Sequence, residues 1–528
     1  MACRASFMRV ASGSRALLLT TTTTTTHGGT SSIGPPPPAC LRYPAPRTFM
    51  QSAGRRRAQL TADAYPELRR DERFGRVTGE HVAFFKQLLG SGSAVVEAEA
   101  DVEPFNEDWM HKYRGQCRLV LRPASTDQGG NTGLVGGSVP VFDEIVVSMA
   151  RMNRIHSFDD ASGCLVLDAG CVLEAADTYL ADRGHVFPLD LGAKGSCHVG
   201  GNVATNAGGL RFLRYGSLHG SVLGLEAVLP DGTVLDDLST LRKNNTGYDL
   251  KQLFIGAEGS IGIITRLAVH CPQRPAAVNV AFLGLASYPH ARRAFRQAKA
   301  HLSEILSAFE LMDARSQQLV HAVRPAEKRP LDGDFPFYCL VETSGSNGEH
   351  DYAKLEAFLE HVMSEDIVAD GVVAQDATQI KALWGWRESV PECIGHWGGV
   401  YKYDVSIPLP DMYAIVDDVK ARLADMGLLG DTDQHPALGV VGYGHMGDCN
   451  LHLNVAVRRY DKRVEQALEP FVYEWIAKRK GSISAEHGLG LAKKKFIQYS
   501  RSDTMVALMK QIKHLYDPNG IMNPYKYI

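Results

Sequence analysis

The chain has 528 residues, a formal net charge of −3 at pH 7 and ten cysteines. Its length predicts roughly two or three domains with sizeable cores. The near-neutral charge argues against nucleic acid as a partner, and the lack of an apolar run of about 18 residues predicts no membrane span. The cysteines occur singly, without a C-x-x-C pair, which favours a reducing compartment over a disulfide framework.

Residues 1–60 differ in composition from the rest of the chain. They are rich in Arg, Ser, Thr and Pro, contain no acidic residue, and include the low-complexity tracts Thr20–Thr26 and Pro35–Pro38. Such tracts cannot build a core, and an Arg-rich, acid-poor N-terminus is typical of a mitochondrial transit peptide. We therefore expect a transit peptide or disordered arm here and a location in the mitochondrial matrix.

The region from about Arg118 to Cys271 contains short apolar runs separated by glycines. Runs such as Glu144–Val147 and Cys164–Leu167 predict strands, and Val172–Arg183, which Gly184 follows, predicts a helix. The alternation of short strands and helices predicts an α+β domain.

Three glycine-rich loops interrupt this region: Gly129–Gly133, Gly200–Gly209 and Gly256–Gly262. Glycine lacks the Cβ that keeps backbone N–H groups away from an anion, so successive N–H groups can surround a phosphate. A single glycine cluster is usually only a turn. Three such loops close together, two with small amide side chains between the glycines, indicate a large ligand that contains pyrophosphate.

From about Pro275 to Asp503, longer helical patterns alternate with strands. Tyr288–Leu306 and Met412–Met426 predict helices, whereas Tyr338–Val341 predicts a strand. This pattern suits an antiparallel sheet covered by helices, which would form a substrate-binding cap.

Two short segments near the C-terminus, Gly444–Asn454 and Ser484–Gly488, concentrate histidine and carboxylate side chains. His445 and His452, seven residues apart, form with Glu486 an open set of two nitrogen ligands and one oxygen ligand. Such a set suits Zn²⁺ with one position left for a substrate. The plain alternative is a pair of structural histidines at a strand end, with the glutamate in a polar loop.

Neighbours of these residues also have predicted roles. His487 directly follows the carboxylate and would be free to act as a base. Asn450, His452 and Asn454 alternate with apolar residues, and on a strand such alternation places the three polar side chains on one face. His445, which precedes this strand, can fold toward the same face.

Longer motifs resemble a known family. The run Gly195–Gly209, followed by Arg214–Gly216, resembles the FAD domain of the vanillyl-alcohol-oxidase-type flavoproteins. Gly444–Asn454 and Ser484–Gly488 resemble the D-2-hydroxyacid dehydrogenase branch of that family. The resemblance extends from about Asp101 to Ile528, and motifs of both domains occur in the same order.

The resemblance implies an α+β fold with four segments. After residues 1–60, it places a two-subdomain FAD-binding domain of the vanillyl-alcohol-oxidase type at residues 61–274. An α/β substrate (cap) domain with an antiparallel sheet and the zinc site follows at 275–500. Residues 501–528 would pack back near the FAD domain.

The resemblance also implies noncovalent FAD, because no histidine between Lys112 and His156 corresponds to the one that anchors FAD covalently in some relatives. Compared with the family pattern, the chain lacks a helix and a strand, roughly twenty residues at ordinary element lengths, after Asp127. This departure leaves the placement of the first glycine loop open. The residues that the resemblance places around FAD are Gly130, Asn131, Thr132, Gly133, Gly200, Gly201, Asn202, Thr205, Asn206, Gly208, Gly209, Glu258, Gly259 and Ile263.

For the catalytic site, the family pattern implies three roles. The zinc ligands would be His445, His452 and Glu486. His487 would take the proton of the substrate hydroxyl, and the substrate would contact Arg387, Lys402, Asn454 and His487. A metal lowers the pKa of a hydroxyl that it binds, a base with a pKa near 7 removes the proton, and the cofactor supplies the redox chemistry.

We therefore expect an FAD- and zinc-dependent dehydrogenase that oxidises D-2-hydroxyglutarate to 2-oxoglutarate. Hydride would pass to the flavin, and the resemblance implies electron-transfer flavoprotein as acceptor. Three alternatives stay open: a D-lactate dehydrogenase of the same branch, a zinc hydrolase that uses the same ligands with His487 as base, and an inactive structural homologue.

Overall fold

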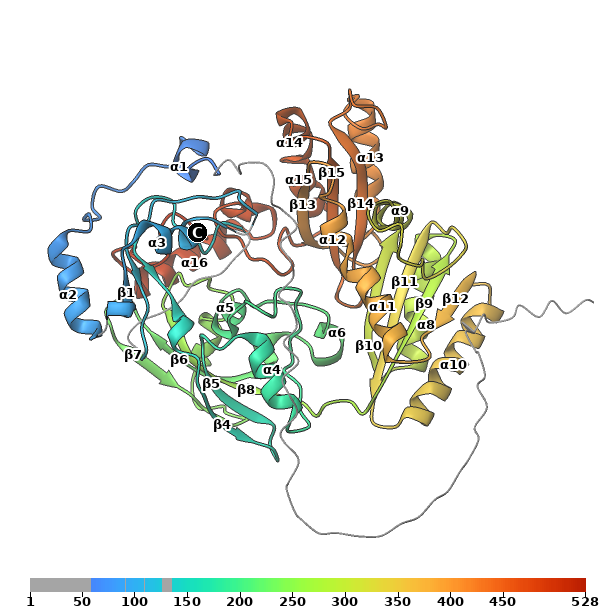
Figure 1. Ribbon diagram of the computed structural model, residues 1–528, viewed down its shortest axis with the longest axis horizontal. Coiled ribbons are helices and arrows are strands. Elements are labelled where there is room, and N and C mark those ends of the chain that lie inside the picture. The colour runs from blue at the N-terminus through green and yellow to red at the C-terminus, as the bar shows by residue number, and fades with distance from the viewer. Residues whose placement is uncertain (1–57, 91, 109, 126–134) are drawn as a thin grey trace, which may run out of the picture. The chain divides into compact units, whose positions relative to one another are not determined.

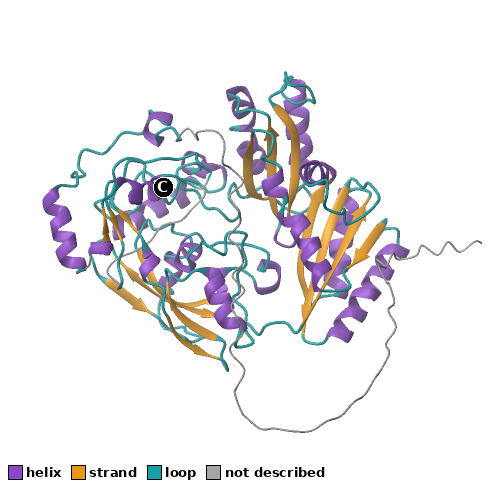
Figure 2. Cartoon of the chain, viewed as in Figure 1, coloured by secondary structure: helices purple, strands orange, loops and turns teal. Residues whose placement is uncertain are grey.

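The structure is a computed structural model, and it describes residues 58–90, 92–108, 110–125 and 135–528. The prediction of a transit peptide lies almost wholly outside the described residues. So do the predicted cofactor contacts Gly130, Asn131, Thr132 and Gly133 and the short connection after Asp127. Helices and strands are both present throughout the described part (Figure 2). None of the described helices combines the length and apolar composition that a membrane span requires.

Two sheets form the N-terminal half of the described chain (Figure 1). A small three-stranded sheet pairs β2 antiparallel with β1 and parallel with β3. A five-stranded sheet of order β4-β5-β8-β6-β7 is antiparallel throughout. The strands are β1 (Val95–Val96), β2 (Val120–Leu121), β3 (Val146–Val147), β4 (Ile155–Asp159), β5 (Cys164–Asp168), β6 (Val222–Val228), β7 (Val234–Asp237) and β8 (Ile263–His270).

Short helices pack against these sheets. The predicted helix at 172–183 is present as α4, one residue shorter at its start and two at its end. One apolar core joins α4 and α5 to β5, β6 and β8 of the five-stranded sheet. The helices of this half are α1 (Thr61–Ala64), α2 (Gly79–Leu89), η1 (Gly92–Ala94), α3 (Glu99–Asn106), η2 (Met149–Arg151), α4 (Leu173–Ala181), α5 (Val199–Ala204), α6 (Phe212–Tyr215), α7 (Leu218–Ser221) and η3 (Leu250–Leu253). Leu213 of α6 packs against the core of the second half.

A seven-stranded sheet of order β12-β9-β11-β10-β14-β15-β13 forms the second half, and every pairing in it is antiparallel. The antiparallel sheet predicted for the cap is therefore present. Its strands are β9 (Ala277–Leu285), β10 (Leu306–Asp313), β11 (Phe337–Gly345), β12 (Asp370–Val373), β13 (Gly399–Ser406), β14 (Ala437–His445) and β15 (Asn450–Val457).

Helices cover both faces of this sheet (Figure 1). Their starts follow local capping; the Asn347 side chain, for example, accepts a hydrogen bond from the His350 N–H at the start of α10. The helices of this half are α8 (Tyr288–His301), α9 (Ala314–Val323), α10 (Gly348–Ser364), α11 (Ala377–Glu388), α12 (Val390–Cys393), α13 (Ala414–Asp425), η4 (Met446–Asp448), α14 (Lys462–Leu468), α15 (Phe471–Lys478) and η5 (Lys494–Tyr499). The last helix, α16 (Asp503–Tyr516), packs instead against the core of the five-stranded sheet.

The prediction for Tyr288–Leu306 is wrong in one respect, because the helix ends at His301. The sequence keeps apolar residues at helical spacing beyond that point. However, Leu302 and Ile305 fill the core from a turn, and Leu306 begins β10. Buried turn residues and buried helix residues look alike in a short apolar pattern.

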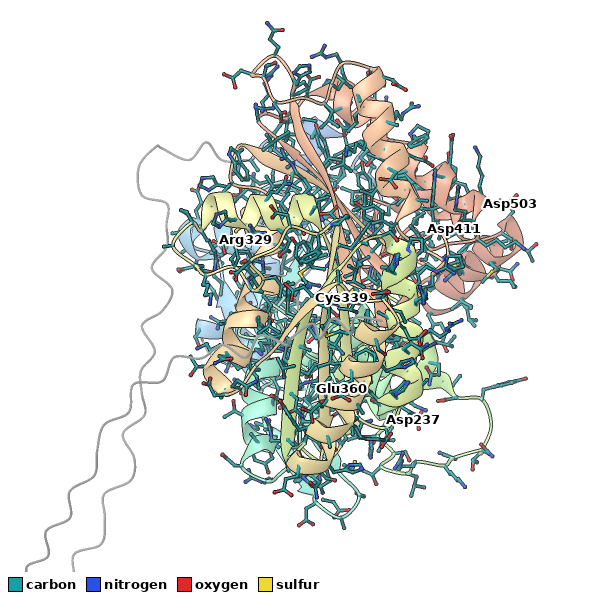
Figure 3. All side chains as sticks on the ribbon, turned by 90° about the vertical axis from the view of Figure 1, so that its right-hand side faces the viewer. Asp237, Arg329, Cys339, Glu360, Asp411 and Asp503 are labelled. Carbon is teal, nitrogen blue, oxygen red and sulfur yellow. The ribbon has the colours of Figure 1, made fainter. Side chains whose placement is uncertain are left out.

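Side-chain alternation gives the seven-stranded sheet two different faces. One face packs its apolar side chains against α8, α10 and α13–α15. On α10, for example, Glu360 is exposed, whereas Cys339 of β11 is buried in the core that this helix covers (Figure 3). The other face packs against α9, α11 and α12 over part of its area. Glu310 of β10, Asp404 of β13, His445 of β14 and His452 of β15 lie on this second face, which therefore holds the site.

Candidate active site

Polar side chains from four neighbouring strands meet on the second face of the seven-stranded sheet. Glu310 of β10 lies opposite His445 of β14, which lies opposite Asn450 of β15. In the next row, His452 of β15 lies opposite Asp404 of β13. His445 is the last residue of β14, so strand register brings it to the face on which His452 lies.

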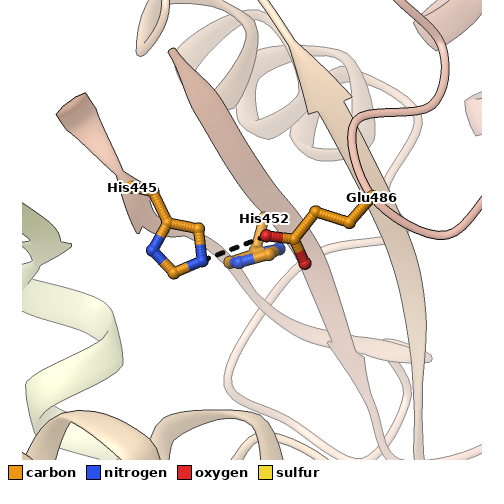
Figure 4. A group of neighbouring side chains, drawn as sticks. All are labelled: His445, His452 and Glu486. Atoms are coloured by element: carbon orange, nitrogen blue, oxygen red, sulfur yellow. Dashed lines mark ion pairs between the residues drawn. The ribbon is translucent and has the colours of Figure 1, made fainter. Parts of the chain in front are cut away.

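The three predicted metal ligands converge (Figure 4). One ligand atom each from His445, His452 and Glu486 lies within 4.8 Å of the others. The His445 Nε2 and Glu486 Oε1 atoms are 3.3 Å apart, near the spacing of about 3.4 Å that tetrahedral bonds of ~2.1 Å impose on two ligands. Yet Glu486 Oε1 is buried and accepts no hydrogen bond from a described residue. These atoms could hold a metal ion.

Two carboxylates lie beside the Nδ1 atoms of the histidines. Glu310 Oε1 is 2.8 Å from His445 Nδ1, which directs Nε2 of that ring toward Glu486. Asp404 lies 3.0 Å from His487 Nδ1 and 3.7 Å from His452 Nδ1. A carboxylate bound to the second ring nitrogen fixes both the tautomer and the orientation of a histidine.

Sequence reasoning missed the roles of Glu310 and Asp404. Each is an acidic residue between two apolar or aromatic neighbours, in the strands Leu306–Asp313 and Gly399–Ser406. A carboxylate in a buried part of a strand needs a partner, and this signal could have identified both residues.

Asp404 also holds the loop that carries Glu486 and His487. Its Oδ2 accepts hydrogen bonds from the backbone N–H groups of Glu486, at 2.8 Å, and His487, at 3.2 Å. Its Oδ1 accepts one from the Asn450 side chain at 2.8 Å. Burial alone would raise the pKa of Asp404, but His487 and Lys493 hold it well below its usual range. One buried anion therefore positions both a predicted ligand and the predicted base.

The histidines differ in electrostatic environment. Burial opposes the charged form of His445, but Glu310 outweighs it and raises the pKa well above its usual value. Burial lowers the pKa of His452 to about 4. Burial also opposes protonation of His487, yet Asp404 raises its pKa. His452 is thus neutral, as a ligand nitrogen must be, whereas His445 would have to release its proton to bind a metal. Asp404 stabilises His487 in the protonated form that a base reaches after taking a proton.

The predicted substrate clamp Arg387 already has a protein partner. This buried side chain donates from Nε, at 3.0 Å, and from Nη2, at 2.7 Å, to Glu310 Oε2. Its guanidinium lies 5.0 Å from the Tyr443 ring centre. The hydrogen bonds to Glu310 use two of the five N–H groups of the guanidinium, and no hydrogen bond joins Nη1 to a described residue. The edge formed by Nη1 and the second N–H of Nη2 can therefore still bind a carboxylate with two parallel hydrogen bonds, and this role stays a prediction.

The other two predicted substrate contacts lie side by side. Lys402 of β13 pairs with Asn454 of β15, on the face that carries His452. Lys402 is exposed, whereas Asn454 is buried and donates from Nδ2 to the His452 carbonyl at 3.2 Å.

Replacing Glu310 with glutamine is expected to lower the free energy of unfolding by about 1.5–3 kcal/mol, because Arg387 would lose a charged acceptor while staying buried. Urea unfolding followed by circular dichroism measures the change. The control is Glu392→Gln, since Glu392 pairs with Arg324 but its side chain is 80% exposed; it should change stability by no more than about 0.5 kcal/mol. Equal unfolding midpoints for the two variants would contradict this expectation.

The predicted cofactor segment Gly200–Gly209 begins with α5 and ends beside the site. Asn202 is buried, and its Oδ1 accepts no hydrogen bond from a described residue. A Cβ on Gly209 would lie 2.2 Å from the Asp190 carbonyl oxygen, so close packing explains that glycine. A Cβ on Gly208 would lie 3.3 Å from Glu486 Cγ. The segment therefore touches the residue predicted to bind metal.

Further members of the predicted cofactor set have intramolecular partners. Thr205 donates from its hydroxyl to the Gly201 carbonyl at 3.1 Å. Asn206 accepts from the Ser217 hydroxyl at 3.1 Å. Glu258 donates its backbone N–H to the Ala204 carbonyl at 2.8 Å, which brings the third glycine loop against the second. Gly200 packs on Ala169, Gly259 has a positive φ of 70°, and Ile263 begins β8.

Two family models match the chain. The model described as "FAD binding domain" matches residues 125–237, and the model described as "FAD linked oxidases, C-terminal domain" matches residues 274–527. The first match covers the second glycine loop, and the second covers the metal-type triad.

Named relatives match most of the chain. A mitochondrial protein of Schizosaccharomyces pombe, named provisionally as a D-lactate dehydrogenase, is 55% identical over 89% of this chain and 94% of its own. A D-2-hydroxyglutarate–pyruvate transhydrogenase of Saccharomyces cerevisiae is 49% identical over 89% and 99%. The mitochondrial D-2-hydroxyglutarate dehydrogenase of Bos taurus is 50% identical over 89% and 87%.

Solved structures share the fold at low sequence identity. An alkyldihydroxyacetonephosphate synthase aligns with a TM-score of 0.65 and 17% identity, over 85% of this chain and 86% of its own. The 4-ethylphenol oxidase of Gulosibacter chungangensis aligns with a TM-score of 0.63 and 16% identity, over 85% and 98%. Together with the two family models, these neighbours confirm the predicted α+β fold of the vanillyl-alcohol-oxidase type.

Proposed function

Because this chain belongs to the family of FAD-linked oxidases, and is thus an FAD-dependent oxidoreductase, we propose that it is a mitochondrial matrix dehydrogenase that oxidises D-2-hydroxyglutarate to 2-oxoglutarate with the help of zinc. The observation that carries the proposal is the contact between two predicted sites. Gly208 of the cofactor segment lies against Glu486, whose neighbour His487 is the predicted base. A substrate on the metal would therefore lie near the flavin.

The residues present fit FAD. The buried Asn202 Oδ1 lacks a donor among the described residues, and a flavin ring offers N–H donors. When bound, FAD accepts the hydride from the substrate. The segments around Asn202, Asn206 and Gly259 would hold it without a covalent bond.

The donor set of the triad fits zinc. Two histidines and one carboxylate leave one position open for a substrate, and the buried Glu486 Oε1 accepts no hydrogen bond from any residue that the structure describes. When bound, zinc lowers the pKa of a hydroxyl that it binds. Non-haem iron uses a similar set of ligands, so quantification of metals in the purified protein is required to identify the ion.

The protein's own residues would handle the proton. Asp404 holds His487 Nδ1 at 3.0 Å, which leaves Nε2 as the ring nitrogen that takes the proton of the C2 hydroxyl. The same carboxylate stabilises the resulting imidazolium, as the raised pKa of His487 indicates. Asn454 and Lys402 lie on the adjacent row of the sheet and would contact the substrate carboxylates.

The substrate assignment predicts a preference between two acids. If Arg387 and Lys402 serve the two carboxylates, kcat/KM for D-2-hydroxyglutarate should exceed that for D-lactate by tens- to thousands-fold, since a lost charged partner costs roughly 2–5 kcal/mol. Lys402→Met should reduce this preference, whereas Lys420→Met, a change at an exposed position on α13, should leave it unchanged. Equal kcat/KM values for the two acids would favour the D-lactate alternative. The Schizosaccharomyces pombe relative is named for that activity.

The electron acceptor is a separate part of the proposal. We propose electron-transfer flavoprotein, and the name of the Saccharomyces cerevisiae relative offers pyruvate as a second candidate. Protein reduced anaerobically with D-2-hydroxyglutarate and freed of excess substrate would be mixed with each acceptor in turn. Rapid return of the flavin absorbance with electron-transfer flavoprotein supports the first assignment, and rapid return with pyruvate alone supports the second.

A single preparation tests the core of the proposal. The purified protein should be yellow, contain zinc and lose its flavin absorbance when D-2-hydroxyglutarate is added without oxygen. A colourless protein that contains zinc would support the hydrolase alternative. A flavoprotein that no D-2-hydroxy acid reduces would support the inactive homologue.

A further inference from the structure

Glu258 grips the backbone of the loop that carries the predicted metal ligand and base. Its Oε1 accepts a hydrogen bond from the Leu489 N–H at 2.6 Å, and its Oε2 accepts one from the Gly490 N–H at 2.8 Å. These two residues follow Glu486 and His487 almost directly. Because a carboxylate bound to two consecutive N–H groups fixes both position and direction, the contact constrains the whole loop.

The backbone of Glu258 is tied to the cofactor segment at the same time. Its N–H donates to the Ala204 carbonyl at 2.8 Å, and the Gly256 N–H donates to the Val203 carbonyl at 3.1 Å. The Asn523 side chain donates to the Glu258 carbonyl at 2.7 Å. Glu258 has a positive φ of 51°, which a residue with a Cβ adopts only where its surroundings impose it.

The loop is shaped to receive this carboxylate. Gly488 has a φ of 76°, and a Cβ at that position would lie 2.4 Å from Glu258 Oε1, so any other residue would displace the carboxylate. The Ser484 hydroxyl closes the loop by donating to the Gly488 carbonyl at 2.6 Å. Asp404 holds the Glu486 and His487 N–H groups from the opposite side.

Two buried lysines face Glu258. Lys493 donates to the Asp404 carbonyl at 3.3 Å, and Lys526 donates to the Gly137 and Val139 carbonyls. Burial raises the pKa of Glu258, whereas the N–H groups of Leu489 and Gly490 and the two ammonium groups act in the opposite direction. The geometry of the two loop hydrogen bonds, at 2.6 and 2.8 Å, is the observation that ties Glu258 to the loop.

We propose that Glu258 is a positioning residue that couples the cofactor segment to the catalytic loop. Its carboxylate sets the distance between Gly200–Gly209 and the loop bearing Glu486 and His487. The catalytic consequence rests on the proposed function, whereas the effect on the loop does not. A small shift of this loop would move ligand and base relative to the flavin, and displacement by about 1 Å can cost on the order of 10²-fold in rate.

The test compares Glu258→Gln with Glu226→Gln. Glu226 is a matched control because it is a buried carboxylate of β6 that accepts from the Thr265 hydroxyl at 2.7 Å, away from the loop. Amide hydrogen exchange of residues 484–492 reports loop position without turnover. Flavin content, zinc content and the rate of flavin reduction at saturating D-2-hydroxyglutarate complete the comparison.

Glu258→Gln should exchange the Leu489 and Gly490 amides about ten- to a hundredfold faster, as expected for a lost charged hydrogen bond. It should keep FAD, reduce it up to ~10²-fold more slowly and change KM little. Glu258→Asp, which retains a carboxylate on a shorter side chain, should recover part of both effects. Glu226→Gln should match the parent in both.

Three results would overturn the proposal. These are unchanged exchange in Glu258→Gln, loss of FAD with a normal reduction rate for the flavin that remains, and equal effects of the Glu226 variant. If Glu258→Gln does not fold, the exchange of Glu258→Asp decides in the same way. If the parent protein itself fails to reduce its flavin with D-2-hydroxyglutarate, the proposed function fails, and amide exchange still decides the role of Glu258.

Discussion

Replacing His445, His452 or Glu486 with alanine is expected to release zinc and remove most turnover while FAD stays bound. The three ligand atoms lie within 4.8 Å of one another, and an open site with only three protein ligands loses much of its metal affinity when one of them is removed. Loss of Lewis-acid assistance is worth several kcal/mol, or a rate decrease on the order of 10³-fold or more. Metal quantification, the flavin absorbance spectrum and steady-state turnover measure the three parts of this result.

The control for this set is His321→Ala, because His321 is exposed on α9 and lies outside the site. It should retain zinc, FAD and activity. The stability of the three ligand variants should change little, since an open catalytic site does not define the fold. Stoichiometric zinc in all three ligand variants would refute the metal assignment.

Replacing His487 with glutamine should slow flavin reduction by on the order of 10²–10⁴-fold, as expected for loss of a positioned general base. Asp404 orients this ring through Nδ1 at 3.0 Å and also holds the His487 N–H. Glutamine can keep a side-chain hydrogen bond to Asp404 but cannot take the proton. Single-turnover loss of flavin absorbance measures the step directly.

Zinc and substrate binding should be retained in the His487 variant, because the base is not one of the three ligands. His321→Gln makes the same exchange on the surface and should reduce flavin at the parent rate. A His487 variant that also reduces flavin at the parent rate would show that another group takes the proton. Loss of zinc in it would show instead that His487 belongs to the metal site.

Local patterns in the sequence were sufficient for several features of the site. The alternation in Asn450–Val457 placed His452 and Asn454 on one face, because successive side chains of a strand point to opposite sides. The helix at Leu173–Ala181 was predicted within two residues at each end, because its apolar residues recur at helical spacing and Gly184 follows it. At Tyr288–Leu306 the same kind of reasoning went too far, because an apolar turn and an apolar helix differ only in their tertiary contacts.

The sequence by itself determined that the chain is an FAD-dependent oxidoreductase and predicted a metal site, and the tertiary structure decided which side chains lie together around that site. Two histidines and a glutamate in Gly-flanked motifs indicate a metal site, since few other arrangements require those residue types together. Strand register and long-range packing placed Glu310 next to His445, joined two N–H groups of Arg387 to Glu310, and put Glu258 against the loop of Glu486. Such contacts join residues more than 70 positions apart, and local sequence carries no information about those distances.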